Sequence, residues 1–146
     1  MARPHLPLAY PVRLDPAEEG GFVLTFPDFG VGVTQGDDRE EALAQAADLL
    51  ETMVANYMAE GWDLPEPSPA RGRPLVGLAP LVAAKAELFR AMRQSGIDKT
   101  ELAQRLGIAT KDVDHLFSIH HKTRLDQIGA ALAVLGRRLV VGVEPA

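Results

Sequence analysis

Apolar and polar residues alternate in the first third of the chain, which is the pattern of short, half-buried β-strands. The alternation predicts one strand over residues 8–15, and because Pro11 removes a backbone donor this strand is expected to begin at a sheet edge or after the proline. A second strand is expected in GFVLTFP and a third around Val31 to Thr34. The Asp-Pro pair and the two glycines of DPAEEGG mark the turn between the first two strands. Together these segments predict a β-meander.

Helical spacing replaces this alternation after residue 38. Asp38 and Glu41 have the spacing of a capping box, and Gly61 is a natural left-handed stop. Between them apolar side chains recur every three or four residues, at Leu43, Ala46, Ala47, Leu50, Met53, Val54, Tyr57 and Met58. We therefore expect one long helix whose apolar stripe packs on the meander and whose acidic face is solvated.

Proline is concentrated in PEPSPARGRP, residues 65–74, where neither a helix nor a regular strand ladder is expected. We interpret this stretch as a hinge. The following PLVGL predicts one more short strand for the first sheet. The boundary is accordingly expected after that strand, between a domain of residues 1–78 and a domain of residues 79–146.

The second domain is expected to be helical with a terminal strand. Pro80 suits a first helical turn, Gly96 and Gly107 suit stops, and Ile108 is expected to fill the junction after Gly107. The inward-facing residues would be Leu81, Ala84, Leu88 and Met92, then Leu102, Ala103, Leu106, Val113, Leu116 and Phe117, and finally Leu125, Ile128, Ala131, Leu132 and Leu135. RRLVVGV predicts a last strand. The fold class is therefore predicted as α+β, a β-meander and helix followed by an all-α domain that ends in a strand.

The composition limits the chemistry. The chain has 47% hydrophobic residues and no cysteine, which favours a packed core and excludes disulfides, thiolate metal ligands and a cysteine nucleophile. Its N-terminal MARPHLPLAYPV lacks the apolar run of a signal peptide, and no stretch approaches the roughly 18 apolar residues of a membrane span. We expect a cytoplasmic protein without membrane association.

Charge is divided unevenly along the chain. Residues 1–69 hold 3 Lys and Arg against 13 Asp and Glu, a net of −10, whereas residues 70–146 hold 12 against 7, a net of +5. An acidic half joined to a basic half suggests two partners of opposite charge.

The stretch TELAQRLGIATKDVDHLF, residues 100–117, places two short helical patterns on either side of Gly107. Ala103 is small where the helices must cross, and Val113 and Leu116 would anchor the second helix while its other face stays open. Over about residues 80–136 the pattern resembles the lambda-repressor-like helix-turn-helix, whose second helix reads the major groove. The alternative is a helical bundle without DNA affinity.

This resemblance implies DNA-contacting residues. Thr110, Lys111 and His115 match positions that reach base edges, and Asp114 would either accept from cytosine N4 or weaken binding. Matches to phosphate-contacting positions are Lys99, Thr100, Lys122, Thr123 and Arg124. Asp112 and Asp114 depart from the pattern by placing two carboxylates on the reading helix. Because one reading helix buries too little surface for specificity, we expect a homodimer, or a higher homo-oligomer such as a dimer of dimers, on a palindromic site, paired through the terminal strand.

The first half, YPVRLDPAEEGGFVLTFPDFGVGVTQGDDREEALAQA, resembles the N-terminal domain of HicB-type antitoxins in its Gly-Gly-aromatic strand, FPD, TQGD and EEAL segments. FGVG departs from the Pro-Gly-Cys sequence that is common there. The resemblance implies a partial RNase H-like fold and a protein that neutralises a small basic HicA-like mRNA-cleaving toxin while repressing its own operon. For the toxin-binding surface we expect Asp28, Asp37, Glu40 and Glu41, with Phe29 either as an aromatic anchor or as a core residue.

Two other functions are compatible with the pattern. A metal-dependent RNase H-like nuclease would gather carboxylates from Asp15, Asp28, Asp37, Glu41 and Asp48, but Asp15 falls at a strand end, before a turn. A ligand-sensing repressor would use the meander as its sensor, although no Gly-rich phosphate cradle is present. The spacing of His115, His120 and His121 matches no common zinc pattern, and no serine has the setting of a nucleophile. We expect no enzyme activity, cofactor or metal.

Overall fold

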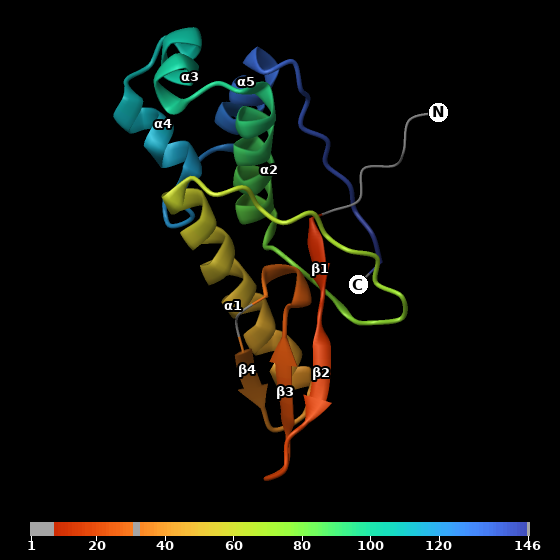
Figure 1. Ribbon diagram of the computed structural model, residues 1–146. Helices are drawn as coiled ribbons and strands as arrows, with labels where there is room; N and C mark the ends of the chain where they lie inside the picture. Colours follow the sequence, from red (N-terminus) through yellow and green to blue (C-terminus); the bar gives the residue numbers. More distant parts are fainter. Residues whose placement is uncertain (1–7, 31–32, 146) are drawn as a thin grey trace. The chain divides into compact units, whose positions relative to one another are not determined.

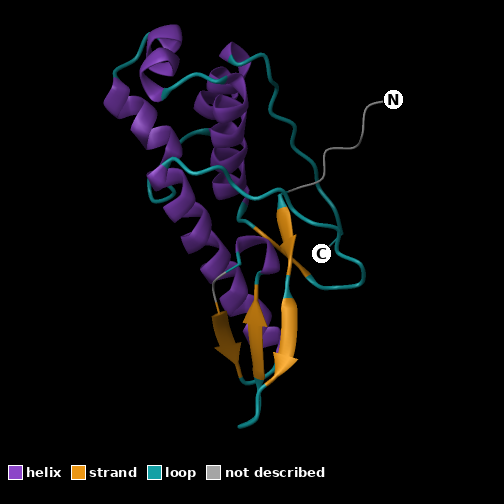
Figure 2. Cartoon of the chain, in the orientation of Figure 1, coloured by secondary structure: helices purple, strands orange, loops and turns teal. Residues whose placement is uncertain are grey.

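The computed structural model describes residues 8–30 and 33–145 and shows the expected mixture of helices and strands. The chain forms two compact units, with the division between Ala83 and Ala84. The strands and the longest helix belong to the first unit, and helices make up the regular structure of the second (Figure 2). None of the described helices has the length and apolar character needed to cross a membrane.

The predicted meander is present as a three-stranded antiparallel sheet in the order β2-β3-β4. Its strands are β2 (Arg13–Pro16), β3 (Phe22–Thr25) and β4 (Val33–Gly36). The third strand runs further than expected, to Gly36, and positions 31–32 of that prediction lie outside the described residues.

The strand predicted over residues 8–15 is wrong as a single element. Its first part, β1 (Ala9–Pro11), pairs antiparallel with β5 (Leu75–Gly77), whereas its second part is β2 of the other sheet. The break follows Pro11, which has no N–H to donate to a ladder. The strand predicted in PLVGL is confirmed, but it forms a two-stranded sheet with β1 instead of extending the meander.

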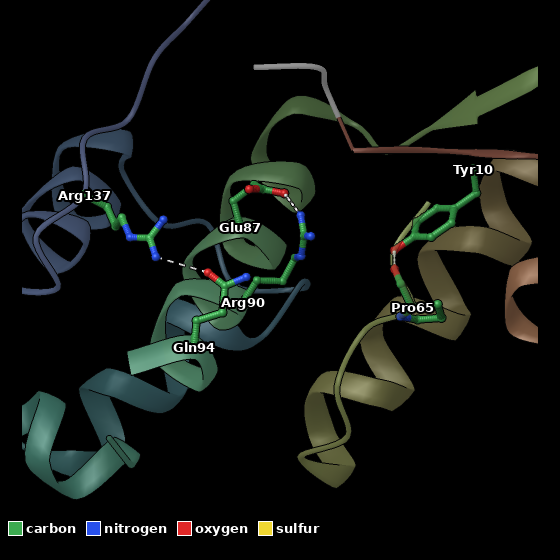
Figure 3. Close-up of polar contacts among 6 residues, drawn as sticks. All are labelled: Tyr10, Pro65, Glu87, Arg90, Gln94 and Arg137. Carbon is green, nitrogen blue, oxygen red and sulfur yellow. Dashed lines mark hydrogen bonds and ion pairs between the residues drawn. The ribbon is translucent and has the colours of Figure 1, made fainter. Parts of the chain in front are cut away.

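The interpretation of residues 65–74 as a hinge is also wrong. The Tyr10 hydroxyl donates to the Pro65 carbonyl at 2.8 Å (Figure 3), and the Ser68 N–H donates to Asp28 Oδ2 at 2.9 Å. The Val12 N–H donates to the Pro74 carbonyl at 3.0 Å. The proline-rich segment is therefore held against the first unit by hydrogen bonds from residues about 40 to 60 positions earlier.

Helix α1 (Arg39–Glu60) begins and ends where the capping signals predicted. The Glu41 N–H donates to Asp38 Oδ1 at 2.7 Å, and Gly61 closes the helix with φ of 72°. The helix packs on one face of the β2–β3–β4 sheet (Figure 1). The shared core contains Leu24, Phe26, Ala42, Ala46, Leu50 and Val54.

Gly36 explains why the TQGD segment needs glycine. A Cβ at this position would lie 2.4 Å from the Ala42 backbone nitrogen, so only glycine lets the end of β4 pass so close to α1.

The second unit is built on α2 (Pro80–Ser95), α3 (Lys99–Leu106), α4 (Thr110–Phe117) and α5 (Leu125–Val134). Its core contains Leu88, Phe89, Leu102, Val113 and Ile128, and the Phe89 and Phe117 rings meet edge to face at 6.0 Å. The four helices lie where the helical spacing predicted them.

Three apolar expectations for this unit are wrong. RRLVVGV forms no strand, and Val143 is fully exposed, because no described strand in this unit offers it a ladder. Arg137 after α5 donates to Gln94 Oε1 of α2 at 3.2 Å (Figure 3), and from there the chain runs on without regular structure. Ile108 is exposed and fills no junction, and Leu125, expected to face inward from the last helix, is exposed as well.

Candidate functional site

Helices α3 and α4 form a pair with one buried and one open side. The turn between them is closed by Gly107 in the left-handed conformation, with φ of 69°, and by the Ile108 N–H donating to the Ala103 carbonyl. Val113, Leu116 and Phe117 bury one face of α4. The opposite face exposes Thr110, Lys111, Asp114 and His115, the residues expected to read base edges.

The N-terminus of α4 has no side-chain cap. Its N-cap residue is Ala109, whereas α1 and α3 begin with the aspartate caps Asp38 and Asp98. The first N–H groups of α4 are therefore open to an external acceptor, and the positive end of the helix dipole favours an anion such as a phosphate.

Lys99 and Asp114 form an ion pair. Lys99 Nζ lies 3.1 Å from Asp114 Oδ1, joining the start of α3 to α4, and 5.7 Å from the centroid of the Phe117 ring. The pair offsets one of the two carboxylates on α4, and it lowers the repulsion that Asp114 would exert on phosphate.

A fully buried lysine holds the segment that follows α4. Lys85 Nζ of α2 donates to the carbonyls of His115 at 3.0 Å, Ser118 at 2.6 Å and His121 at 2.7 Å. It also donates to the Thr123 hydroxyl at 2.8 Å. Burial lowers the pKa of the Lys85 ammonium because the charged form loses hydration. These contacts fix the end of α4 and the residues after it to α2.

The expectation that the Thr123 side chain contacts a phosphate is wrong, because that side chain is buried. It is 7% exposed, and its hydroxyl accepts from Lys85 and donates to the His115 carbonyl at 3.2 Å. Its neighbours Lys122 and Arg124 are exposed, as are Thr100 and Lys111. The structure thus brings the ends of α3, the open face of α4 and residues 122–124 into one region of the second unit.

His115 and His121 form a stacked pair, with ring centroids 4.1 Å apart and planes 9° from parallel. Local desolvation, followed by the charges of His115 and Lys85, lowers the pKa of His121. Sequence reasoning missed both Lys85 and His121. The signal for Lys85 was its place in α2, four residues after Leu81 and three before Leu88, within an otherwise apolar stripe.

The residues expected to bind a toxin do not form one surface. Phe29 is 6% exposed and lies 4.8 Å from the Tyr10 ring and 5.3 Å from the Tyr57 ring, so it is a core residue and not an exposed anchor. Asp28 is half-buried and accepts from Ser68. Asp37, Glu40 and Glu41 are exposed at the start of α1, where Glu41 Oε2 accepts from the Asp37 N–H at 3.3 Å.

A small hollow lies beside these acidic residues. It has a volume of about 140 Å³ and is lined by Ala17, Gly20, Phe22, Gln35, Gly36, Asp37 and Glu41. Small-molecule sites usually enclose roughly 300–1,000 Å³. This hollow is therefore too small to support a ligand sensor.

The carboxylates considered for a nuclease are engaged separately. Asp15 pairs with Arg13 at 3.0 Å, Asp28 Oδ2 accepts from the Ser68 N–H, and Glu41 Oε2 accepts from the Asp37 N–H. Within residues 8–30 and 33–145, no three His, Asp or Glu side chains are grouped so that they could hold a metal ion. The arrangement lacks the convergent carboxylates of two-metal hydrolysis.

Comparison with known proteins agrees with the sequence motifs. Residues 9–87 match the family model of the HicB-like antitoxins of bacterial toxin–antitoxin systems. The chain is 38% identical to antitoxin HicB of Escherichia coli over 133 residues, covering 90% of this chain and 96% of that protein. It is 36% identical to antitoxin HicB 1 of Photorhabdus laumondii over 137 residues, covering 94% and 88%.

Antitoxin HicB of Pseudomonas fluorescens is 35% identical over 113 residues, with 76% of this chain and 77% of that protein covered. The similarity therefore extends past the meander and α1 into the helical unit. The chain belongs to the HicB-like antitoxin family.

Proposed function

We propose that this antitoxin neutralises a small basic HicA-like mRNA-cleaving toxin through its first domain, residues 1–78, and represses its own operon through its second, residues 79–146. The observation that carries the proposal is that charge divides with the compact units. Residues 1–83 contain 5 Lys and Arg against 13 Asp and Glu, a net of −8. Residues 84–146 contain 10 against 7, a net of +3.

The acidic unit suits a cationic protein partner. A toxin that grips RNA must carry positive charge on its RNA-binding face, and a negative surface both steers association and opposes binding of wrong partners. Neutralisation would then be steric and electrostatic, because an antitoxin bound to the RNA-binding face of the toxin prevents RNA from binding there.

The helical unit suits DNA. Thr110, Lys111 and His115 project from the open face of α4, whose uncapped N-terminus favours a phosphate. Lys122 and Arg124 are exposed nearby, and their side chains make no hydrogen bond or ion pair with the described residues. We infer that α4 enters the major groove, with these cations meeting the backbone phosphates.

Two measurements test the proposal. Co-expression with a small basic HicA-like toxin should restore growth and give a complex that co-purifies. A gel shift on the chain's own promoter should show binding that weakens steeply as salt rises, because phosphate contacts release counterions. Failure of both would overturn the proposal.

A further inference from the structure

Trp62 is the single tryptophan of the sequence and lies exposed at the end of α1. It follows the helix stop Gly61 and is 54% exposed, although tryptophan carries one of the largest apolar surfaces of any side chain. The backbone N–H of Trp62 donates to the Tyr57 carbonyl at 2.9 Å, so the backbone of this residue is fixed as part of the helix cap.

The exposed ring is anchored to the core by a chain of aromatic contacts. The Trp62 ring meets Tyr57 edge to face at 5.4 Å, Tyr57 meets Phe29 at 5.3 Å, and Phe29 meets Tyr10 at 4.8 Å. Phe29 and Tyr10 are buried, and the Tyr10 hydroxyl is bonded to Pro65 (Figure 3). Because these contacts already hold the ring in place, ordering it costs little free energy when a partner binds. Rigid aromatic side chains of this kind are typical anchors of protein interfaces.

The charged residues within four positions of Trp62 along the chain are all acidic. Glu60, Asp63 and Glu66 are all exposed and lie within four residues of it. No lysine or arginine occurs between Arg39 and Arg71, a stretch that carries seven carboxylates in all. A partner that covers this end of α1 must therefore be cationic.

We propose that Trp62, with Glu60, Asp63 and Glu66, forms the anchor of the toxin interface and receives an arginine or lysine side chain of the basic toxin on its ring. These four residues are called the Trp62 surface. The indole ring is the best aromatic acceptor for a cation, and the neighbouring carboxylates add attraction. This assignment rests on the proposed toxin-neutralising function and replaces the anchor expected at Phe29.

The experiment uses the intact chain with 5-fluorotryptophan incorporated into it alone. Because Trp62 is the only tryptophan, one ¹⁹F resonance reports its environment. Titration with a purified HicA-like toxin should shift that resonance with a saturating curve, and Trp62→Ala should raise the dissociation constant by about thirtyfold or more. Trp62→Phe should retain part of the affinity.

Matched controls come from the same unit. Leu75 on β5 is 55% exposed, and Leu75→Ala should leave affinity within about twofold. Glu60→Lys should slow association more than Glu19→Lys, which makes the same charge change in the turn between β2 and β3, away from the C-terminal end of α1 (Figure 1).

The outcomes separate the two proposals. Wild-type affinity in Trp62→Ala, or a ¹⁹F resonance that stays still while the complex forms, would overturn the Trp62 surface and leave toxin neutralisation intact. A wild-type chain that binds no toxin at all would overturn both. Thermal unfolding of Trp62→Ala near the wild-type midpoint shows that its loss of affinity is not a loss of fold.

Discussion

At the scale of single residues, Lys85 has the strongest structural role outside the apolar core. A buried ammonium is costly unless it is satisfied, and Lys85 is satisfied by three carbonyls and one hydroxyl. All four acceptors lie in or just after α4, on which the proposed DNA contacts depend. The same cation therefore stabilises the unit and positions its binding face.

Lys85→Met should reduce the free energy of unfolding by about 3 kcal/mol, because it keeps the apolar stem and leaves buried carbonyls without a donor. Chemical denaturation of the intact chain measures this. Lys111→Met provides the control, since Lys111 is exposed and its loss should change stability by less than about 0.5 kcal/mol. Equal stability of Lys85→Met and the wild type would show that the four contacts contribute nothing.

His121 adds a pH dependence to the same region. Its pKa lies below the ordinary 6.5, so between the two values the unfolded chain binds a proton that the folded chain does not. The stability that this group contributes is complete above pH 6.5 and is lost as pH falls through the lowered pKa. Denaturation midpoints from pH 7 to about pH 5 should fall less steeply for His121→Gln than for the wild type.

His120→Gln, which alters the neighbouring imidazole outside the stack, is the control and should keep the wild-type slope. An unchanged slope in His121→Gln would contradict the role assigned to the stacked pair.

At the scale of elements, the C-terminal segment differs from the helices in that its valine side chains are exposed. Residues 137–145 contain apolar side chains that stay exposed, with Val141 72% exposed and Val143 fully exposed, and they form no strand within the chain. A strand-forming sequence without a partner offers unpaired backbone groups to another chain. We propose that two copies pair here to form the homodimer that binds a palindromic site.

Val141→Pro should therefore convert the dimer to a monomer and weaken operator binding, because proline removes a ladder donor. Light scattering during size exclusion measures the mass. Arg138→Ala, in the same segment, should remain dimeric. A wild-type chain that stays monomeric at micromolar concentration would contradict the proposal.

At the scale of the whole molecule, two opposite charges on two compact units predict that the activities separate. Lys111→Ala should abolish the salt-dependent gel shift, since it removes a cation from the open face of α4, and should leave co-purification with the toxin unchanged. Arg138→Ala removes one positive charge outside α3 and α4. In a gel shift with the protein at saturating concentration, this variant should bind DNA as the wild type does. Loss of toxin binding in Lys111→Ala would contradict this division.

Sequence alone predicted what depends on neighbouring residues. Asp38, Gly61 and Gly107 set helix limits through hydrogen bonds and backbone angles within four or five residues, and all three stand where the pattern placed them. Family motifs and the uneven division of charge are likewise properties of the chain as written, and they need no fold to be recognised.

Tertiary structure decided what depends on residues far apart. Phe29 is a core residue because the rings of Tyr10 and Tyr57 pack against it. The Thr123 side chain is buried because its hydroxyl accepts a hydrogen bond from Lys85, 38 positions earlier in the chain. RRLVVGV has strand composition and still forms no strand, since a ladder needs a partner that this unit does not supply. Local pattern determines the helices, but burial and pairing depend on which distant segments meet, and those contacts assign each side chain to the core or the surface.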